Sequence, residues 1–259
     1  MTTLRQFLGG LTCALCGWML TACSSEEDSL QIPEGKGYVK LNLTADAGFQ
    51  TKAVNESDYT NLDNYTVQIL KDGTTQVGED YTYSEITGQL IELERGSYTI
   101  KAFKGTDSPA STTSMYVVGS QDINIANEVK EISFVCKPVC AKVKVAFDTT
   151  MDTYFEDYSI SFQTVALGEG NYTWEKSFSD PVYLKVNEKE QVKAIIKLTK
   201  KDGIKAESSI TKTYELSPLV FKTIKIKPSI SSGSIGIEIT IDEGTNDQNV
   251  DIEVPSDWV

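Results

Sequence analysis

Cysteine offers the clearest chemistry in this sequence, because a thiolate can be acylated, oxidised or bound to a metal. The chain of 259 residues holds Cys13, Cys16, Cys23, Cys136 and Cys140, and it has no histidine. The absence of histidine removes the commonest general base, the commonest metal ligand and every Ser-His-Asp or Cys-His arrangement. Carboxylate pairs remain, but nothing in the spacing of the 37 acidic residues singles one out. We therefore expect no enzyme, with no catalytic residue, no metal site and no cofactor.

Cys23 follows a short apolar segment. Residues 7–22 are nearly all apolar or small, and Arg5 is the one charge before them. Such a stretch is too short to span a bilayer, which needs about 20 apolar residues, so residues 1–22 are expected to be a signal peptide. Leu20-Thr21-Ala22-Cys23 resembles the bacterial lipobox, in which the cysteine thiol takes a diacylglycerol. We expect cleavage between Ala22 and Cys23 and a lipid anchor on Cys23; the alternative is an ordinary secretory signal with a chance cysteine.

Residues 23–36 are expected to form an acidic, flexible tether. Ser24-Ser25-Glu26-Glu27-Asp28 resembles the surface-export signal of Bacteroidetes lipoproteins, although any solvated linker can be acidic. The resemblance implies an outer-membrane protein that faces the cell exterior. The whole chain has a net charge of −13, which argues against nucleic acid as a partner, because binding to phosphates needs basic patches.

From Gly37 onward, apolar residues recur at every second position, which predicts strands that bury one face and expose the other. The pattern covers residues 39–43, 65–69, 98–102, 143–147, 158–162, 192–198 and 235–241, with Lys142 and Lys144 on a solvent-facing side. Turn sequences rich in Gly, Asp and Ser separate these strands. Helical turns are expected only near 56–61 and 152–157. The fold class predicted is all-β, with antiparallel sandwiches.

The two halves of the chain look like copies of one another. Strands at 38–44, 64–69, 97–103 and 132–136 have counterparts at 141–147, 157–162, 191–198 and 224–227. Each half has about the size of an ordinary domain. We therefore expect an N-terminal β-sandwich over residues 37–138 and a C-terminal β-sandwich over residues 139–259, which includes a final long strand and tail.

Several stretches resemble an uncharacterised family of Bacteroidetes surface lipoproteins, which is itself similar to fimbrillin-like proteins. They are Gly37-Tyr38, Thr51-Lys52-Ala53-Val54, Asp63-Asn64-Tyr65-Thr66-Val67, Gly96-Ser97-Tyr98-Thr99, Cys140-Ala141-Lys142-Val143 and residues 251–258. The resemblance implies tandem transthyretin-like or Ig-like β-sandwiches and a role in adhesion or pilus-associated assembly, with other surface or pilus subunits as partners. It carries no catalytic residues.

The same resemblance suggests a maturation site. In fimbrillin-like proteins a trypsin-like protease cuts after a basic residue and removes the N-terminal strand, and the groove then accepts a strand from the next subunit. Here Lys52 and Ala53 follow the first strand. The donor would be strand 235–241 or the tail to Trp258. Lys52 is otherwise an ordinary loop lysine, and the family often has arginine at this place.

Two further modifications can be read from the sequence. Asp28-Ser29-Leu30 and Asp148-Thr149-Thr150 resemble the short O-glycosylation motif of Bacteroidetes exported proteins, which makes Ser29 and Thr149 candidate sites. Cys136 and Cys140 would need a turn at Pro138 to form a disulfide, because in an extended strand they lie too far apart. We favour two separately buried thiols over a bond.

Two loops leave other functions open. Tyr172 and Trp174 follow a polar hairpin and could stack on a sugar ring as an exposed pair, although a cross-strand pair inside a hairpin is commoner. An exposed pair would favour the alternative function, a surface lipoprotein that binds host or dietary glycans for nutrient uptake. Residues 242–249 are rich in oxygen ligands but lack the EF-hand spacing, so a solvated loop is favoured over a calcium site.

Overall fold

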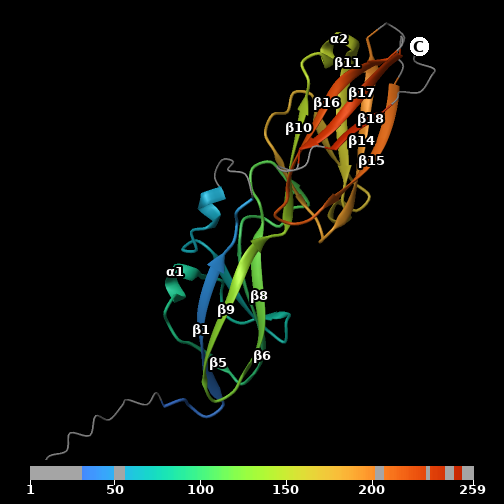
Figure 1. Ribbon diagram of the computed structural model, residues 1–259. Coiled ribbons are helices and arrows are strands. Elements are labelled where there is room, and N and C mark those ends of the chain that lie inside the picture. Colours follow the sequence, from blue (N-terminus) through green and yellow to red (C-terminus); the bar gives the residue numbers. More distant parts are fainter. Residues whose placement is uncertain (1–30, 50–55, 202–206, 232–233, 243–247, 253–259) are drawn as a thin grey trace, which may run out of the picture. The chain divides into compact units, whose positions relative to one another are not determined.

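Strands make up nearly all of the regular structure in the computed structural model, which describes residues 31–49, 56–201, 207–231, 234–242 and 248–252 (Figure 1). The strands of the first half are β1 (Lys36–Ala45), β2 (Thr66–Lys71), β3 (Thr75–Gln76), β4 (Tyr81–Thr82), β5 (Ile91–Glu94), β6 (Gly96–Lys104), β7 (Ala110–Ser111), β8 (Val117–Ile125) and β9 (Val129–Pro138). Those of the second half are β10 (Cys140–Phe147), β11 (Phe155–Gln163), β12 (Tyr172–Glu175), β13 (Val182–Lys185), β14 (Glu190–Lys200), β15 (Glu207–Leu216), β16 (Phe221–Ser231), β17 (Ser234–Asp242) and β18 (Gln248–Ile252). The all-β fold class predicted from the alternation is confirmed.

The helices are single turns. They are η1 (Glu56–Tyr59), α1 (Tyr83–Ile86), α2 (Met151–Tyr154) and η2 (Val165–Leu167). The first and third of these lie where the sequence predicted helical turns, and the other two were not predicted. All helices in the described part of the chain are far too short to span a bilayer.

The strands of the first half form one sheet in the order β3-β2-β6-β8-β9-β1-β5, with β4 also paired to β2. Strands β8 and β9 pair only where Val117 and Val118 meet Pro138 and Lys137. Beyond this short ladder the two parts of the sheet enclose a shared apolar cluster, which takes residues from β1, β2, β6 and β9. The sandwich is therefore closed at one corner by the β8–β9 pairing.

The second half has two separate sheets. Their strand orders are β18-β17-β16-β10-β13-β7 and β12-β11-β14-β15. The cluster between them includes Val143, Phe162, Ile196 and Ile224 from both sheets. The short strand β7 comes from the first half and pairs through Ala110 and Ser111 with Leu184 and Tyr183 of β13. The sheet that contains β10 and β13 therefore includes one strand, β7, from the first half of the chain.

The internal repeat predicted from the sequence is visible in the pairing. β1 is antiparallel to β5 and parallel to β9, and in the same way β10 is antiparallel to β13 and parallel to β16. The ladder β2-β6-β8 in the first half corresponds to β11-β14-β15 in the second. The sandwiches are antiparallel as expected, apart from one parallel pair in each half. Only Val139 separates β9 from β10, at the predicted domain boundary, and the division into domains at that point stays a prediction.

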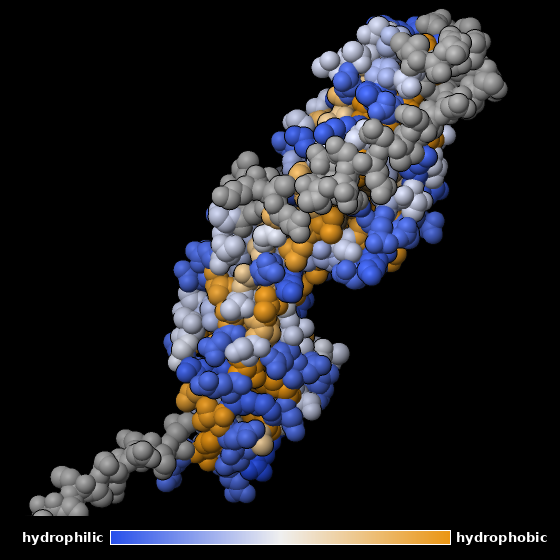
Figure 2. All heavy atoms as spheres, viewed as in Figure 1, coloured by the Kyte–Doolittle hydropathy of each residue, from blue (hydrophilic) through white to orange (hydrophobic). Residues whose placement is uncertain are grey.

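Buried side chains follow the predicted alternation, and hydrophobic residues reach the surface only in patches between hydrophilic ones on the face shown in Figure 2. The predicted orientation of one side chain was wrong. Lys142 was expected on a solvent-facing side of its strand, yet its side chain is fully buried. A segment of the first half covers the outer face of β10 at this point.

Cys136 and Cys140, both in the described part of the chain, are buried and not joined to one another. The Cys136 thiol lies 3.6 Å from the carbonyl oxygen of Ala102, and burial raises its pKa to about 11. We expect the mass of the purified protein to correspond to two thiols. Cys136 should resist alkylation at pH 8 until the protein is unfolded, because little thiolate is present. A mass lower by two hydrogens would instead show a disulfide.

Candidate functional site

Strand β1 is the element to which the sequence assigned an exchange function, and it lies inside its sheet. Over its first residues it pairs with β5, from Lys36 with Glu94 to Val39 with Ile91. On the other side it pairs with β9 from Tyr38 with Val129 to Ala45 with Cys136, and Figure 1 shows the two strands side by side. Removing β1 would therefore separate β5 from β9 and open a groove through the sheet.

The inner face of β1 fills that groove. Val39, Leu41 and Leu43 are 0%, 1% and 5% exposed and belong to the first apolar cluster. The alternation continues past the end of the strand, because Ala47 and Phe49 are buried as well. The Asp46 N–H donates to the carbonyl of Cys136 at 2.9 Å, which keeps this continuation extended beside β9. Every second residue from 39 to 47 thus lies in the groove, with Ala45 only partly buried, and Phe49 continues the alternation beyond it.

The outer face of β1 carries polar pairs. Lys40 forms an ion pair with Glu131 at 3.2 Å, and Lys36 forms one with Glu92 at 3.4 Å. The Tyr38 hydroxyl donates to Glu92 at 3.1 Å, and this hydrogen bond raises the pKa of Tyr38. Exposed pairs of this kind contribute little to stability, at most about 1 kcal/mol each. Burial of the inner face, not these pairs, holds the strand in place.

One side of β1 is covered by a helix turn instead of a strand. The pairing of β1 with β5 stops at Val39, which faces Ile91, the first residue of β5. Farther along β1, the N–H of Leu43 donates to the Tyr83 hydroxyl at 3.1 Å. Tyr83 and Ile86 of α1 are buried against the same cluster. Along this part, β1 has a complete ladder on its β9 side only.

Gly37 is needed where β1 begins. A Cβ at this position would lie 2.1 Å from the carbonyl oxygen of Ala126. We expect Gly37→Ala to lower the free energy of unfolding by about 1–3 kcal/mol, because the backbone must shift to relieve the clash. Gly48→Ala is the matched control, since a Cβ there meets no atom within 4 Å. Urea denaturation of both variants measures the difference, and equal midpoints would contradict the clash.

Beyond β1, Phe49 lies against a row of side chains that we call the Lys142 cage, formed by Lys142, Tyr183 and Phe221. Lys142 on β10 is the register partner of Tyr183 on β13 and of Phe221 on β16. The Lys142 ammonium lies 5.8 Å from the Tyr183 ring centroid, 5.2 Å from that of Phe221 and 5.7 Å from that of Phe49. The Phe49 and Tyr183 rings are 5.8 Å apart. Phe49 thus covers the cage and buries Lys142.

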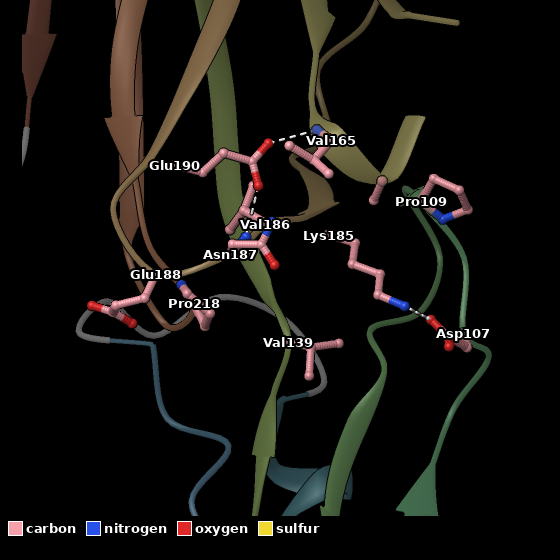
Figure 3. A pocket seen from close by; sticks show the side chains of 11 residues that line it. Asp107, Pro109, Val139, Val165, Lys185, Val186, Asn187, Glu188, Glu190 and Pro218 are labelled. Atoms are coloured by element: carbon pink, nitrogen blue, oxygen red, sulfur yellow. Dashed lines mark hydrogen bonds and ion pairs between the residues drawn. The ribbon is translucent and has the colours of Figure 1, made fainter. Parts of the chain in front are cut away.

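A separate hollow of about 570 Å³ lies beside the start of β14 (Figure 3). The buried Glu190 carboxylate accepts hydrogen bonds from the N–H groups of Val165 and Asn187, both at 2.7 Å. Lys185 and Asp107 form an ion pair at 2.6 Å. The charged side chains drawn in Figure 3 with dashed lines are therefore already engaged within the protein, and they join loops rather than offer a reactive group.

Most of the site residues predicted from the sequence lie outside the described residues. This applies to Ala22, Cys23, Ser29, Lys52 and Ala53, and to residues 243–247 of the acidic loop. Thr149 is described and lies on an exposed turn between β10 and α2. Within the described ranges, no three acidic or cysteine side chains come together in a way that could hold a metal ion.

Trp174 is not part of an exposed aromatic pair. Its side chain is 0% exposed, and on β12 it is the register partner of Ile160 on β11. The commoner interpretation, a cross-strand pair inside a hairpin, is therefore the correct one for Trp174. Among the large hydrophobic side chains exposed on the described surface, Phe178 is the aromatic one.

Sequence reasoning missed the Lys142 cage. The signal that could have found it is the spacing of Phe49, which continues the alternation of β1 beyond Ala45. The partners of Phe49 are distant in sequence, so no local pattern indicates that they lie together.

The model of a family described as "Domain of unknown function (DUF4493)" matches residues 35–256, a range that contains every strand from β1 to β18. No curated protein matches the chain.

Among solved structures, the fold is similar to that of a candidate adhesin from Bacteroides ovatus, with 11% identity over 85% of this chain and 97% of the other and a TM-score of 0.51. A candidate adhesin from Bacteroides thetaiotaomicron has 13% identity, coverage of 85% and 99%, and a TM-score of 0.47. The fimbrial anchor protein Mfa2 from Porphyromonas gingivalis has 12% identity, coverage of 80% and 98%, and a TM-score of 0.44. At these identities the first likeness shows the fold alone. The family model spans most of the sequence, and the chain therefore belongs to the DUF4493 family.

Proposed function

We propose that this chain is a lipid-anchored protein of the outer membrane that faces the cell exterior and acts in adhesion or in pilus-associated assembly. The pattern that ends in Cys23 supports the anchor. The likeness in fold to a protein described as a candidate adhesin supports a role at the surface. The observation that carries the assembly role is the position of β1, an internal strand followed closely by the basic residue Lys52.

The geometry of β1 suits strand exchange. Full burial of a Leu or Val side chain is worth about 1.5–3 kcal/mol, so Val39, Leu41 and Leu43 together hold the strand firmly. Loss of β1 would expose the pockets that Val39, Leu41 and Leu43 now fill. It would also expose the N–H and C=O groups of β9 that now pair with β1. An added strand can satisfy both, because main-chain hydrogen bonds supply affinity and alternate side chains fill pockets.

Of the two donors considered from the sequence, the tail is better suited than strand 235–241. β17 is paired on one side with β16 and on the other with β18, and its Ile237 and Ile239 are buried in the core of the second half. Donating β17 would break two ladders and empty that core. Among the described strands β18 pairs with β17 alone, so a donor that runs from β18 toward Trp258 breaks a single described ladder.

Glycan binding remains the alternative function, but the described surface does not favour it. Its supporting feature was an exposed aromatic pair, and Trp174 is buried. A glycan array with the mature protein tests this alternative directly.

The proposed function is tested on intact cells. We expect a lysine-directed protease to shift the N-terminus of the surface protein from Cys23 to Ala53 and to produce a ladder of oligomers. Lys52→Ala should abolish both effects, whereas Lys36→Ala serves as a matched control and should leave them unchanged. Molecules that all begin at Cys23, with no oligomers, would exclude a polymerising subunit. Deleting the gene should lower adhesion to surfaces, and unchanged adhesion would refute the adhesive role.

A further inference from the structure

The Lys142 cage lies at the end of the groove that β1 occupies. Val39, Leu41, Leu43 and Ala47 are buried in the groove of the first half, Ala45 is partly buried there, and the next position in the same alternation is Phe49. Phe49 contacts side chains of β10 and β13 in the second half. These contacts belong to the compact unit Ile32–Val259. A strand that replaces β1 and reaches as far as Phe49 must therefore fill the cage as well as the groove.

We infer that the Lys142 cage is a recognition pocket for an aromatic side chain, and that in assembly it receives Trp258 from the tail of a second copy of this chain. The inference rests on the proposed strand exchange and adds to it the register and the residue that determines specificity. Phe49 fills the pocket before exchange, and the incoming indole takes its place.

The sequences of the two segments support this register. Read backwards at alternate positions from 49 to 41, the resident segment holds Phe, Ala, Ala, Leu and Leu. Read in the same way from 258 to 250, the tail holds Trp, Ser, Val, Ile and Val. Both segments therefore place an aromatic residue first, a small residue second and large aliphatic residues at the far end. The larger Val254 would stand at Ala45, a position that is only partly buried.

The chemistry of the pocket favours an aromatic ring. The Lys142 ammonium lies within 6 Å of the Tyr183 and Phe221 centroids, and the face of an added ring completes the same set of cation–π contacts that Phe49 makes now. Trp gives the strongest interaction of this kind. The register has one cost. Pro255 would stand at Asp46, whose N–H bonds to Cys136, and proline cannot donate that bond.

The test uses the full mature chain with residues 50–55 replaced by the recognition sequence of a site-specific protease, so that it does not depend on cleavage at Lys52. After cutting, a fluorescent peptide of residues 248–259 is added, and its anisotropy and the release of the N-terminal fragment that carries Phe49 are followed. We expect the parent peptide and a Trp258→Phe peptide to bind, and a Trp258→Ala peptide to bind about tenfold more weakly. The substitution Lys142→Met in the receptor should weaken the binding of the parent peptide. Lys101→Met, which alters a lysine beside Phe103 and Tyr116, is the matched control and should have no effect.

The outcomes separate the two proposals. If the parent and Trp258→Ala peptides bind equally well, strand exchange stands and the recognition pocket is refuted. If no peptide binds, even after the cut fragment has been removed in mild denaturant, strand exchange fails and the inference fails with it.

A second measurement uses the uncut chain and needs no exchange. Phe49→Trp should keep the urea midpoint close to that of the parent protein, whereas Phe49→Ala should lower it. If Phe49→Trp is as destabilising as Phe49→Ala, the cage cannot hold an indole and the inference is overturned.

Discussion

Replacement of Cys23 by alanine is expected to abolish metabolic labelling with a palmitate analogue and to release the protein from the membrane fraction. The physical reason is that each buried methylene is worth about 0.8 kcal/mol, so two or more acyl chains give stable anchoring. Residues 1–22 are expected to be removed on export, after which the lipid on Cys23 is the membrane anchor that the sequence predicts. The loss of labelling and the release from the membrane fraction should therefore both be complete.

Cys16→Ala is the matched control, because the same substitution is made within the expected signal peptide at a thiol that is removed by cleavage. Its labelling and fractionation should equal those of the parent protein. Labelling that persists in Cys23→Ala would show that the lipid is attached elsewhere or that the pattern is an ordinary secretory signal. This experiment tests the lipid anchor alone. Strand exchange is tested separately, by cleavage at Lys52 on intact cells.

Hydrophobic alternation was enough to predict β1, β2, β6, β10, β11, β14 and β17. β6, for example, places Tyr98, Ile100 and Ala102 inward, as the period of two requires. The repeat was also readable, because equivalent strands carry the same alternation at the same spacing. What alternation cannot give is strand partners. A strand that buries one face shows the same pattern in a parallel or an antiparallel pair, so the β1–β9 and β10–β16 pairs could not be distinguished from antiparallel ones.

The candidate site was harder to predict because its parts are distant in the sequence. Lys142 alternates with buried valines, which predicted a solvent-facing side chain. It is buried because Phe49, far away in the sequence, lies over it. The short strand β7 was missed for a related reason, since two residues show no period and form a strand through their pairing with the distant β13. Tertiary contacts override the local pattern at these places.

Trp174→Ala is expected to lower the free energy of unfolding by about 3–5 kcal/mol, because it removes the largest fully buried side chain of the second half. The indole N–H has no hydrogen-bond partner among the residues that the structure describes. Trp174→Phe should therefore be much milder, because it keeps most of the apolar volume and removes a donor that is buried without an acceptor. Urea denaturation of the two variants measures the difference between them.

Phe178→Ala separates this packing role from a glycan-binding role. The Phe178 ring lies 6.3 Å from the Trp174 ring and is 42% exposed, so its loss should cost far less stability than the loss of Trp174. If Trp174 served as a sugar platform, Trp174→Ala would abolish glycan binding and leave the urea midpoint nearly unchanged. Burial of Trp174 predicts the opposite order, in which the midpoint falls steeply and Phe178→Ala stays close to the parent protein. An unchanged midpoint in Trp174→Ala would contradict the buried position and restore the glycan-binding alternative.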